Sequence, residues 1–295
     1  MAKSSIAGTR PMAPGSRINL YGPTFPRAMN NVDIQTVVRA FGKATHLASK
    51  SGFDAVEVHA GHGYLISQFL SPYTNRRKDS FGGSLENRAR LMNMVMESVK
   101  QAAGNDLAVL VKTNMRDGFA GGIEREEAVE IAKMLERAGA DALVLSGGFV
   151  SKAPMYVMRG AMPVKILAHF IEEPLSRFFV RHFGKYLIKE VPFTEAYFLE
   201  DALRFRKEVS LPLVYVGGLT TREKIDEVLS KGFELVAMAR VLIKDPDFIK
   251  KLQRQEISRS ECDICNYCIA VMFSQQATCI LNEENVSPQI MKMLK

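Results

Sequence analysis

Five short apolar segments, each followed by a glycine-rich or charged loop and then by a helical pattern, recur along this chain of 295 residues. Such regular alternation predicts a parallel sheet whose successive strands are connected by helices. The segments that we predict as strands cover 54–58, 107–113, 142–145, 213–216 and 235–238. The segments that we predict as helices cover 31–51, 84–103, 124–138, 194–208 and 221–231.

The ends of these strands favour one kind of parallel sheet over another. Each predicted strand runs into glycine or charged residues, which is typical of a (β/α) barrel, where such loops surround an open mouth. No G-x-G-x-x-G sequence follows the first strand, so a doubly wound dinucleotide-binding sheet is disfavoured. The apolar run 107–113 also predicts a strand that is buried on both faces. The sequence therefore predicts an α/β protein built from barrel-type repeats.

Composition limits the partners that the chain could have. The net charge of +7 comes from lysines and arginines spread along the whole chain without a nucleic-acid-binding motif, so we expect no nucleic-acid partner. No apolar run approaches a length of about 18 residues, which a membrane span needs, and the polar first residues predict no secretory signal. All four cysteines lie from Cys262 onward, unlike those of a disulfide-rich secreted domain. These features predict a cytoplasmic protein with no membrane partner.

The loop after the first predicted strand carries the strongest candidates for catalysis. His59, His62 and Tyr64 all lie on this loop. Imidazole and phenol groups can donate hydrogen bonds to a substrate oxygen, and a tyrosine can also transfer a proton. Two alternatives stay open for the histidines, which could cap buried carbonyl groups at the strand end or bind zinc together with Glu57.

Glycine pairs and basic residues follow the later predicted strands. Gly217-Gly218 would let backbone N–H groups approach an anion, and Arg240 is a planar donor suited to phosphate. Because barrels commonly bind phosphate at the loops after their last two strands, we predict a phosphate site here. An ordinary turn is the alternative for the glycine pair, and Lys112 at the end of the second strand could simply extend into solvent.

Several of these residues belong to the motifs of a known family. The run H-x-x-H-G-Y-L…Q-F-L-S-P…N-x-R-x-D…G-G-S-x-E-N-R-x-R over 59–90 and the later V-G-G…M-A-R-V-L-I-K-D-P-D resemble the old yellow enzyme family of FMN-linked NADH:flavin oxidoreductases. The resemblance extends over about 26–282 and implies a TIM (β/α) barrel of the FMN-linked oxidoreductase type. The family has three strands before the H-x-x-H strand, and this chain is expected to lack these first three strands.

The resemblance also implies how the chain is divided. We expect an irregular N-terminal arm over 1–30, a partial FMN-binding (β/α) barrel over 31–257 and a cysteine-containing tail over 258–295. The amphipathic stretch 164–193 is expected to pack on the barrel or to cover its mouth, rather than to lie on a membrane surface. An open sheet edge favours pairing, so we expect either a homo-oligomer or a second chain that supplies the missing strands.

The roles of the family's site residues carry over to matching positions of this chain. By resemblance, His59 and His62 bind the electron-withdrawing group of an activated alkene, and Tyr64 donates the proton. A cation beside the flavin ring would stabilise the negative charge of the reduced cofactor. The positions expected to contact FMN are Lys112, Ser146, Gly147, Gly148, Gly217, Gly218, Ala239 and Arg240.

Two of these expectations depart from the family or have an equal alternative. Ala239 stands at a position where the family commonly has glycine, which narrows the approach of the backbone to a phosphate. A structural turn explains Ser146-Gly147-Gly148 as well as a contact with the cofactor does.

The cysteines have the spacing C-x₂-C-x₂-C-x₁₀-C, formed by Cys262, Cys265, Cys268 and Cys279. Four thiolates can hold a [4Fe–4S] cluster or a tetrahedral zinc ion. The 2,4-dienoyl-CoA reductase branch of the family has a related run for an iron–sulfur cluster, but the second and third gaps here are each one residue shorter. A cluster, a zinc ion and free redox-active thiols all stay open.

The resemblance implies an enzyme that uses FMN and NAD(P)H to reduce activated C=C bonds. Its substrate would be a small electrophilic alkene, such as an enone. Hydride would pass from NAD(P)H to flavin and then to the substrate in a ping-pong sequence. The alternative is an inactive or partner-dependent fragment of such an enzyme.

Overall fold

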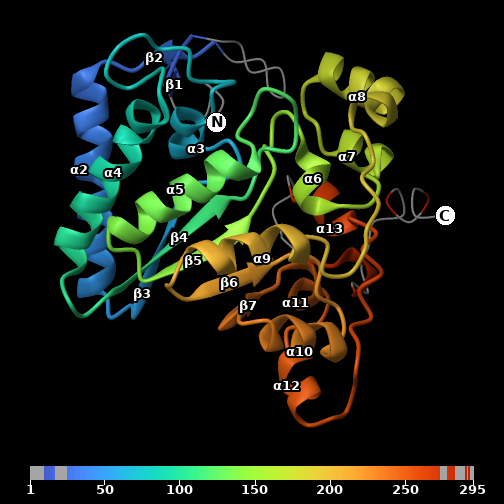
Figure 1. Ribbon diagram of the computed structural model, residues 1–295. Helices are drawn as coiled ribbons and strands as arrows, with labels where there is room; N and C mark the ends of the chain where they lie inside the picture. The colour runs from blue at the N-terminus through green and yellow to red at the C-terminus, as the bar shows by residue number, and fades with distance from the viewer. Residues whose placement is uncertain (1–9, 17–24, 273–277, 283–289, 291, 293–295) are drawn as a thin grey trace. The chain divides into compact units, whose positions relative to one another are not determined.

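The computed structural model describes residues 10–16, 25–272, 278–282, 290 and 292 (Figure 1). The chain forms two compact units, and each contains segments that are distant in sequence. The first unit comprises Met1–Pro154, Phe198–Val216 and Lys231–Val236. The second unit comprises Met155–Tyr197, Gly217–Ser230 and Ala237–Lys295.

In the residues that the structure describes, the first unit is built on an open sheet of five strands in the order β3-β4-β5-β6-β7. Strands β3 to β6 pair in parallel, as the alternation of strands and helices predicts. The five predicted strands are therefore confirmed, each within a residue or so of its predicted bounds. Their bounds are β3 Ala55–His59, β4 Ala108–Asn114, β5 Ala142–Ser146, β6 Leu213–Val216 and β7 Leu235–Ala237.

Helices cover one face of this sheet (Figure 1). Val58, Val109 and Val111 point to the covered face and are at most 4% exposed. The prediction that β4 is buried on both faces is wrong, because Leu110 and Lys112 on the opposite face are only partly buried. The helices of this unit are α2 Asn31–Lys50, α3 Leu65–Leu70, α4 Leu85–Ala103, α5 Arg125–Arg137 and α9 Leu199–Glu208.

The start of α2 is fixed by a capping box. Asn30 is the N-cap, because its side chain accepts the Asp33 N–H at 2.9 Å. The Asp33 carboxylate in turn accepts the Asn30 N–H at 2.9 Å and N–H groups of Arg27 Nη1 and Nη2 at 2.5 and 2.7 Å. Arg27 lies in β2 (Arg27–Ala28), which pairs in parallel with β1 (Met12–Ala13), so the predicted irregular arm contains a short paired element.

The second unit is mainly helical. A small core gathers Ile166, Leu167, Ala270, Val271 and Ile280. In the described residues of both units, no helix is both long enough and apolar enough to span a membrane. The helices here are α6 Pro154–Met158, α7 Val164–His169, α8 Pro174–Leu187, α10 Arg222–Ser230, α11 Arg240–Lys244, α12 Phe248–Gln253, α13 Tyr267–Ala270 and a 3₁₀ turn at Ile280–Asn282.

The predicted helix 194–208 begins only at Leu199. Residues before it serve another purpose, because the Glu195 carboxylate accepts the N–H groups of Thr220 and Thr221 at 2.7 and 2.6 Å. These contacts hold the chain at the start of α10 and keep residue 195 out of a helix. Side-chain bonds of this kind compete with helical periodicity.

The capping box gives a test of how α2 is anchored. The hydrogen bonds from Arg27, followed by the backbone bond from Asn30, lower the pKa of Asp33 to about 2. A carboxyl group with a lowered pKa adds stability above its unfolded pKa of about 3.9, and this stability is lost as the pH falls through about 2. We expect Asp33→Asn to lower the free energy of unfolding at pH 7, and the deficit to shrink as the pH falls from about 4 toward 2 in urea titrations.

Asp106→Asn is the matched control, because Asp106 is exposed in the turn after α4. It should show no comparable deficit at any pH. A deficit of Asp33→Asn that stays constant down to pH 2 would contradict the capping argument.

Candidate active site

The carboxyl ends of β3, β4 and β5 lie at one edge of the sheet in the first unit. The register pairs His59 with Lys112 across β3 and β4, and Asn114 with Ser146 across β4 and β5. In parallel sheets with helical connections, this edge is where loops gather functional groups.

The three predicted catalytic residues come together at this edge. His59 Nε2 lies 3.1 Å from His62 Nδ1, and the two rings meet edge to face with centroids 5.0 Å apart. The Tyr64 ring lies 4.7 Å from the His59 ring, and Tyr64 is 46% exposed. On its other side, His62 Nε2 lies 2.7 Å from Ser146 Oγ. The structure therefore brings one predicted cofactor contact, Ser146, into the histidine pair.

Both imidazoles of the pair are neutral near pH 7. Burial lowers the pKa of His62 to about 3, and a proton on His59 or the charge of Lys112 acts in the same direction. Burial also lowers the pKa of His59, with Lys112 as the next cause. Each neutral imidazole carries one N–H, so the bond between the rings uses one and leaves one more. When the Ser146 hydroxyl donates to His62 Nε2, the remaining N–H is on His59 Nδ1, where a ligand oxygen could accept it.

Lys112 is held beside this pair by an ion pair across the strands. Its Nζ lies 2.6 Å from Glu57 Oε1, and the Lys112 side chain is 25% exposed. Glu57, which sequence suggested as a further zinc ligand, is thus paired with a lysine. Within the described part of the chain, no three His, Cys, Asp or Glu side chains are placed to share a metal ion.

Two buried polar residues of this site were missed from the sequence. Asn114 ends β4, and Asp117 follows it in the loop; they are 3% and 0% exposed. Asn114 Oδ1 accepts the backbone N–H of His62 at 2.9 Å, and its Nδ2 donates to the carbonyl of Gly148 at 2.8 Å. Their signal in the sequence was the amide and carboxylate in K-T-N-M-R-D, directly after a predicted strand.

The predicted phosphate-binding residues lie in the second unit. Gly218 has φ +73°, and an added Cβ would lie 2.6 Å from the Tyr197 ring and 2.7 Å from the Phe193 ring. Aromatic packing therefore already requires a glycine at this position. The phosphate role of Gly217 and Gly218 stays a prediction.

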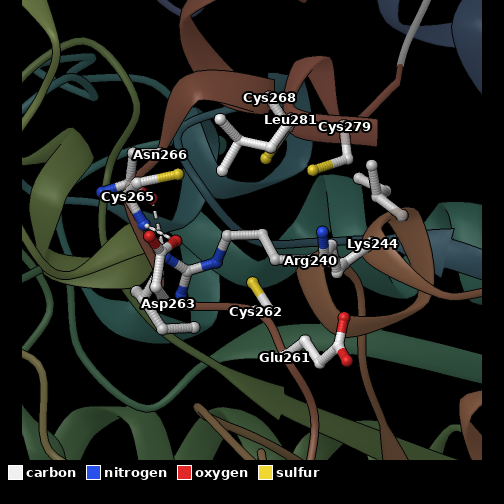
Figure 2. Close-up of a pocket in the computed structure, with 12 residues that line it drawn as sticks. Arg240, Lys244, Glu261, Cys262, Asp263, Cys265, Asn266, Cys268, Cys279 and Leu281 are labelled. Atoms are coloured by element: carbon white, nitrogen blue, oxygen red, sulfur yellow. Dashed lines mark hydrogen bonds between the residues drawn. The ribbon is translucent and has the colours of Figure 1, made fainter. Parts of the chain in front are cut away.

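Arg240, at the start of α11 and directly after Ala239, is anchored by an asparagine of the cysteine-containing tail. Its Nη1 donates to Asn266 Oδ1 at 2.7 Å. Asn266 Nδ2 donates in turn to the carbonyls of Arg159 and Ala161 at 2.7 and 3.0 Å. Figure 2 shows the Arg240 side chain crossing the middle of a pocket that the cysteines line. The sequence predicted this arginine and these cysteines separately, and the structure places them together.

The pocket has a volume of about 20 Å³, room for about one water molecule. Cys262, Cys265, Cys268 and Cys279 line it and are free thiols. Burial raises the pKa of Cys265 to about 12 and also raises the pKa of Cys262 and of Cys268. Four thiols match the donor set of an iron–sulfur cluster, and Arg240 and Lys244 line the pocket together with Glu261 and Asp263. The four thiols share one pocket, although no three of these described side chains are gathered around a metal position.

The neutral state of His62 gives a test by acid destabilisation. Because its folded pKa is about 3, only the unfolded chain binds this proton between about pH 6.5 and 3. The contribution of neutral His62 to the free energy of unfolding is therefore complete above about pH 6.5 and decreases as the pH falls. Between pH 7 and 5 we expect wild type to lose about 2 kcal/mol more unfolding free energy than His62→Gln, as measured by urea titration. His46→Gln, at an exposed position of α2, should lose as much as wild type. Equal losses in wild type and His62→Gln would show that His62 is not held neutral.

Comparison with known proteins gives the family. The model of the NADH:flavin oxidoreductase / NADH oxidase family matches residues 5–176. The chain is 36% identical over 269 residues to the 4,4'-dithiodibutanoate disulfide reductase of Rhodococcus erythropolis. The aligned part covers 90% of this chain and 66% of that protein.

Two solved structures share the fold. A 2-naphthoyl-CoA reductase in complex with 2-naphthoyl-CoA is 26% identical with a TM-score of 0.70, over 87% of this chain and 35% of that one. The old yellow enzyme homologue from Zymomonas mobilis is 23% identical with a TM-score of 0.64, over 89% of this chain and 66% of that one. The chain thus spans between about a third and two-thirds of the length of these proteins. Its sheet is the open, five-stranded form of a TIM-type (β/α) barrel, and the chain belongs to the NADH:flavin oxidoreductase / NADH oxidase family.

Proposed function

We propose that this protein is an FMN-dependent NAD(P)H oxidoreductase that reduces activated C=C bonds of small electrophilic molecules. The observation that carries this proposal is the cluster at one sheet edge of His59, His62, Tyr64 and Lys112. One outward imidazole N–H from the histidine pair, an exposed phenol and a cation are groups that a flavin-dependent reduction of a polarised double bond can use. Membership of the family supports the use of FMN and NAD(P)H.

In this function each side chain of the cluster has a separate role. The outward N–H of the histidine pair binds the substrate's electron-withdrawing oxygen and polarises the double bond. Tyr64, exposed beside His59, donates a proton to the alkene carbon that does not receive hydride. Lys112 balances negative charge beside the flavin ring, and its ion pair with Glu57 orients it. Bound FMN would supply the hydride, received from NAD(P)H.

The remaining cofactor contacts are assigned residue by residue. We assign Gly147 and Gly148, after β5, to the ring side of FMN together with Ser146. Gly217, Gly218, Ala239 and Arg240 are assigned to its phosphate. Arg240 keeps further N–H donors besides the one that binds Asn266, because a guanidinium carries five.

The visible absorption spectrum tests cofactor binding directly. We expect the chain, purified and mixed with FMN, to retain the flavin through gel filtration, with bands shifted from those of free FMN. Lys112→Gln should weaken retention, whereas Lys250→Gln, an exposed position of α12, should not. A wild-type chain that retains no FMN would instead support the alternative of an inactive fragment, or of one that depends on a homo-oligomer or on a second chain.

Replacing the proton donor tests the chemistry. We expect Tyr64→Phe to slow reoxidation of the reduced flavin by 2-cyclohexenone about 100-fold, because a general acid typically contributes about that much. Reduction of the flavin by NAD(P)H should be unchanged, and stopped-flow absorbance separates the two half-reactions. Tyr186→Phe, at an exposed position of α8, is the matched control. Normal reoxidation of Tyr64→Phe would remove Tyr64 from the mechanism.

Disulfides are a second substrate class. The Rhodococcus relative, at 36% identity, is a disulfide reductase. Hydride and a proton delivered to an S–S bond give two thiols, so the same site could serve. Reoxidation of the reduced flavin by 4,4'-dithiodibutanoate faster than by 2-cyclohexenone would favour this class.

For the cysteine pocket we propose a [4Fe–4S] cluster held by Cys262, Cys265, Cys268 and Cys279. The support is the shared pocket, where Arg240 and Lys244 lie among the thiols together with the carboxylates of Glu261 and Asp263. We expect anaerobically purified protein to contain iron and acid-labile sulfide, and Cys268→Ser to lose both. Zinc without sulfide would favour the structural zinc alternative, and neither metal would favour free thiols.

A further inference from the structure

A buried carboxylate lies behind the histidine pair in the first unit. Asp117 Oδ2 accepts the Ser71 hydroxyl at 2.6 Å and the Ile123 N–H at 2.9 Å. Its Oδ1 accepts Asn114 Nδ2 at 2.9 Å. All three partners donate to the carboxylate, and their bonds oppose the burial that raises the pKa of Asp117. Asp117 is 0% exposed, which makes each of these bonds matter, since a buried polar group without its partner is costly.

The carboxylate determines which way the Asn114 amide faces. Its Nδ2 donates to Asp117 and to the Gly148 carbonyl, while its Oδ1 accepts the N–H of His62. Turning this amide over would set oxygen against two acceptors and nitrogen against a donor. Because Asp117 Oδ1 accepts from Asn114 Nδ2, it holds the amide oxygen toward His62.

The Asn114 oxygen stabilises the backbone conformation of His62. His62 has φ +60°, a left-handed conformation that residues other than glycine adopt at an energetic cost. Its N–H is held by Asn114, and its carbonyl accepts the Val150 N–H at 3.0 Å. This conformation directs the two ring nitrogens of His62 to His59 and to Ser146.

Neighbouring glycines leave room for the network. A Cβ on Gly61 would lie 2.8 Å from Asn114 Oδ1, and a Cβ on Gly122 would lie 2.6 Å from Asp117 Cβ. The two loops therefore approach the amide and the carboxylate more closely than a residue with a side chain at position 61 or 122 would allow.

We propose that Asp117 is a positioning residue of this site: acting through Asn114, it holds the strained His62 backbone and thereby aligns the His62 ring between His59 and Ser146. Asp117 touches neither substrate nor flavin in this role. The inference deepens the proposed function and rests on it for the role of the histidine pair. The alignment of the His62 ring itself depends only on contacts within the polypeptide.

Asp117→Asn tests the proposal in the full chain mixed with FMN. The new amide can keep its oxygen toward Ser71 and Ile123 only by presenting N–H to the Asn114 amide, which must then turn away from His62. We expect the His62 backbone N–H to exchange with solvent at least about tenfold faster, by NMR-detected hydrogen exchange. We also expect the ¹⁵N shifts of the His62 ring to move, with His62→Gln used to assign them.

Ser71→Ala is the matched control. It removes a hydrogen bond from the same buried carboxylate but leaves the Asn114 contact in place. It should lower thermal stability about as much as Asp117→Asn, while the His62 exchange rate and ring shifts stay within about twofold of wild type. Equal changes in the two variants, or no change in either, would overturn the proposal, because the network would then be only structural.

Asn114→Ala covers the case in which Asp117→Asn does not fold. It removes the amide while Asp117 keeps Ser71 and Ile123, so it must reproduce the changes at His62, and an unchanged His62 would overturn the proposal. These readouts do not depend on turnover. An inactive chain whose His62 responds as described would refute the proposed function and leave the positioning role standing.

Discussion

The parallel register of β3, β4 and β5 is the constraint on which the candidate site depends. It sets Lys112 beside His59 and Ser146 beside Asn114. Because side chains alternate along a strand, a slip of one residue would turn Lys112 toward the helices that cover Val111. A lysine there would have to be buried without Glu57, and burying an unpaired charge is costly. The apolar face of β4 therefore enforces the register that assembles the polar site.

The sequence was sufficient for the strands and for the loop with His59, His62 and Tyr64, because both are local signals. Apolar runs mark the strands, and the motif is contiguous. It was insufficient for Asn114 and Asp117, whose roles arise from bonds to His62 and Ser71, which lie tens of residues away in the chain. A polar residue after a strand is ordinary until the fold shows what it faces. The same limit applies to Glu57, whose partner is on another strand.

Two differences from the expected secondary structure also have physical causes. An apolar run such as 107–113 does not tell whether one or both faces of a strand are covered, and here Leu110 lies on the partly exposed face. The helical pattern of 194–208 continues through its first residues, but Glu195 binds two backbone N–H groups ahead of α10. Three hydrogen bonds to one carboxylate, including that from the Thr221 hydroxyl, outweigh a single helical turn.

In the second unit, two separate sequence predictions meet at one side chain. Arg240 was assigned to a phosphate and the cysteines to a metal centre, yet the guanidinium lines the cysteine pocket and binds Asn266. Its charge opposes the burial that raises the pKa of Cys262 and Cys268. Loss of FMN from an Arg240 variant would therefore have two explanations, a lost phosphate contact or a disturbed cysteine pocket. An Asn266 variant separates them, because it removes the hydrogen bond that orients Arg240 from the cysteine side and leaves the charge of the arginine in place.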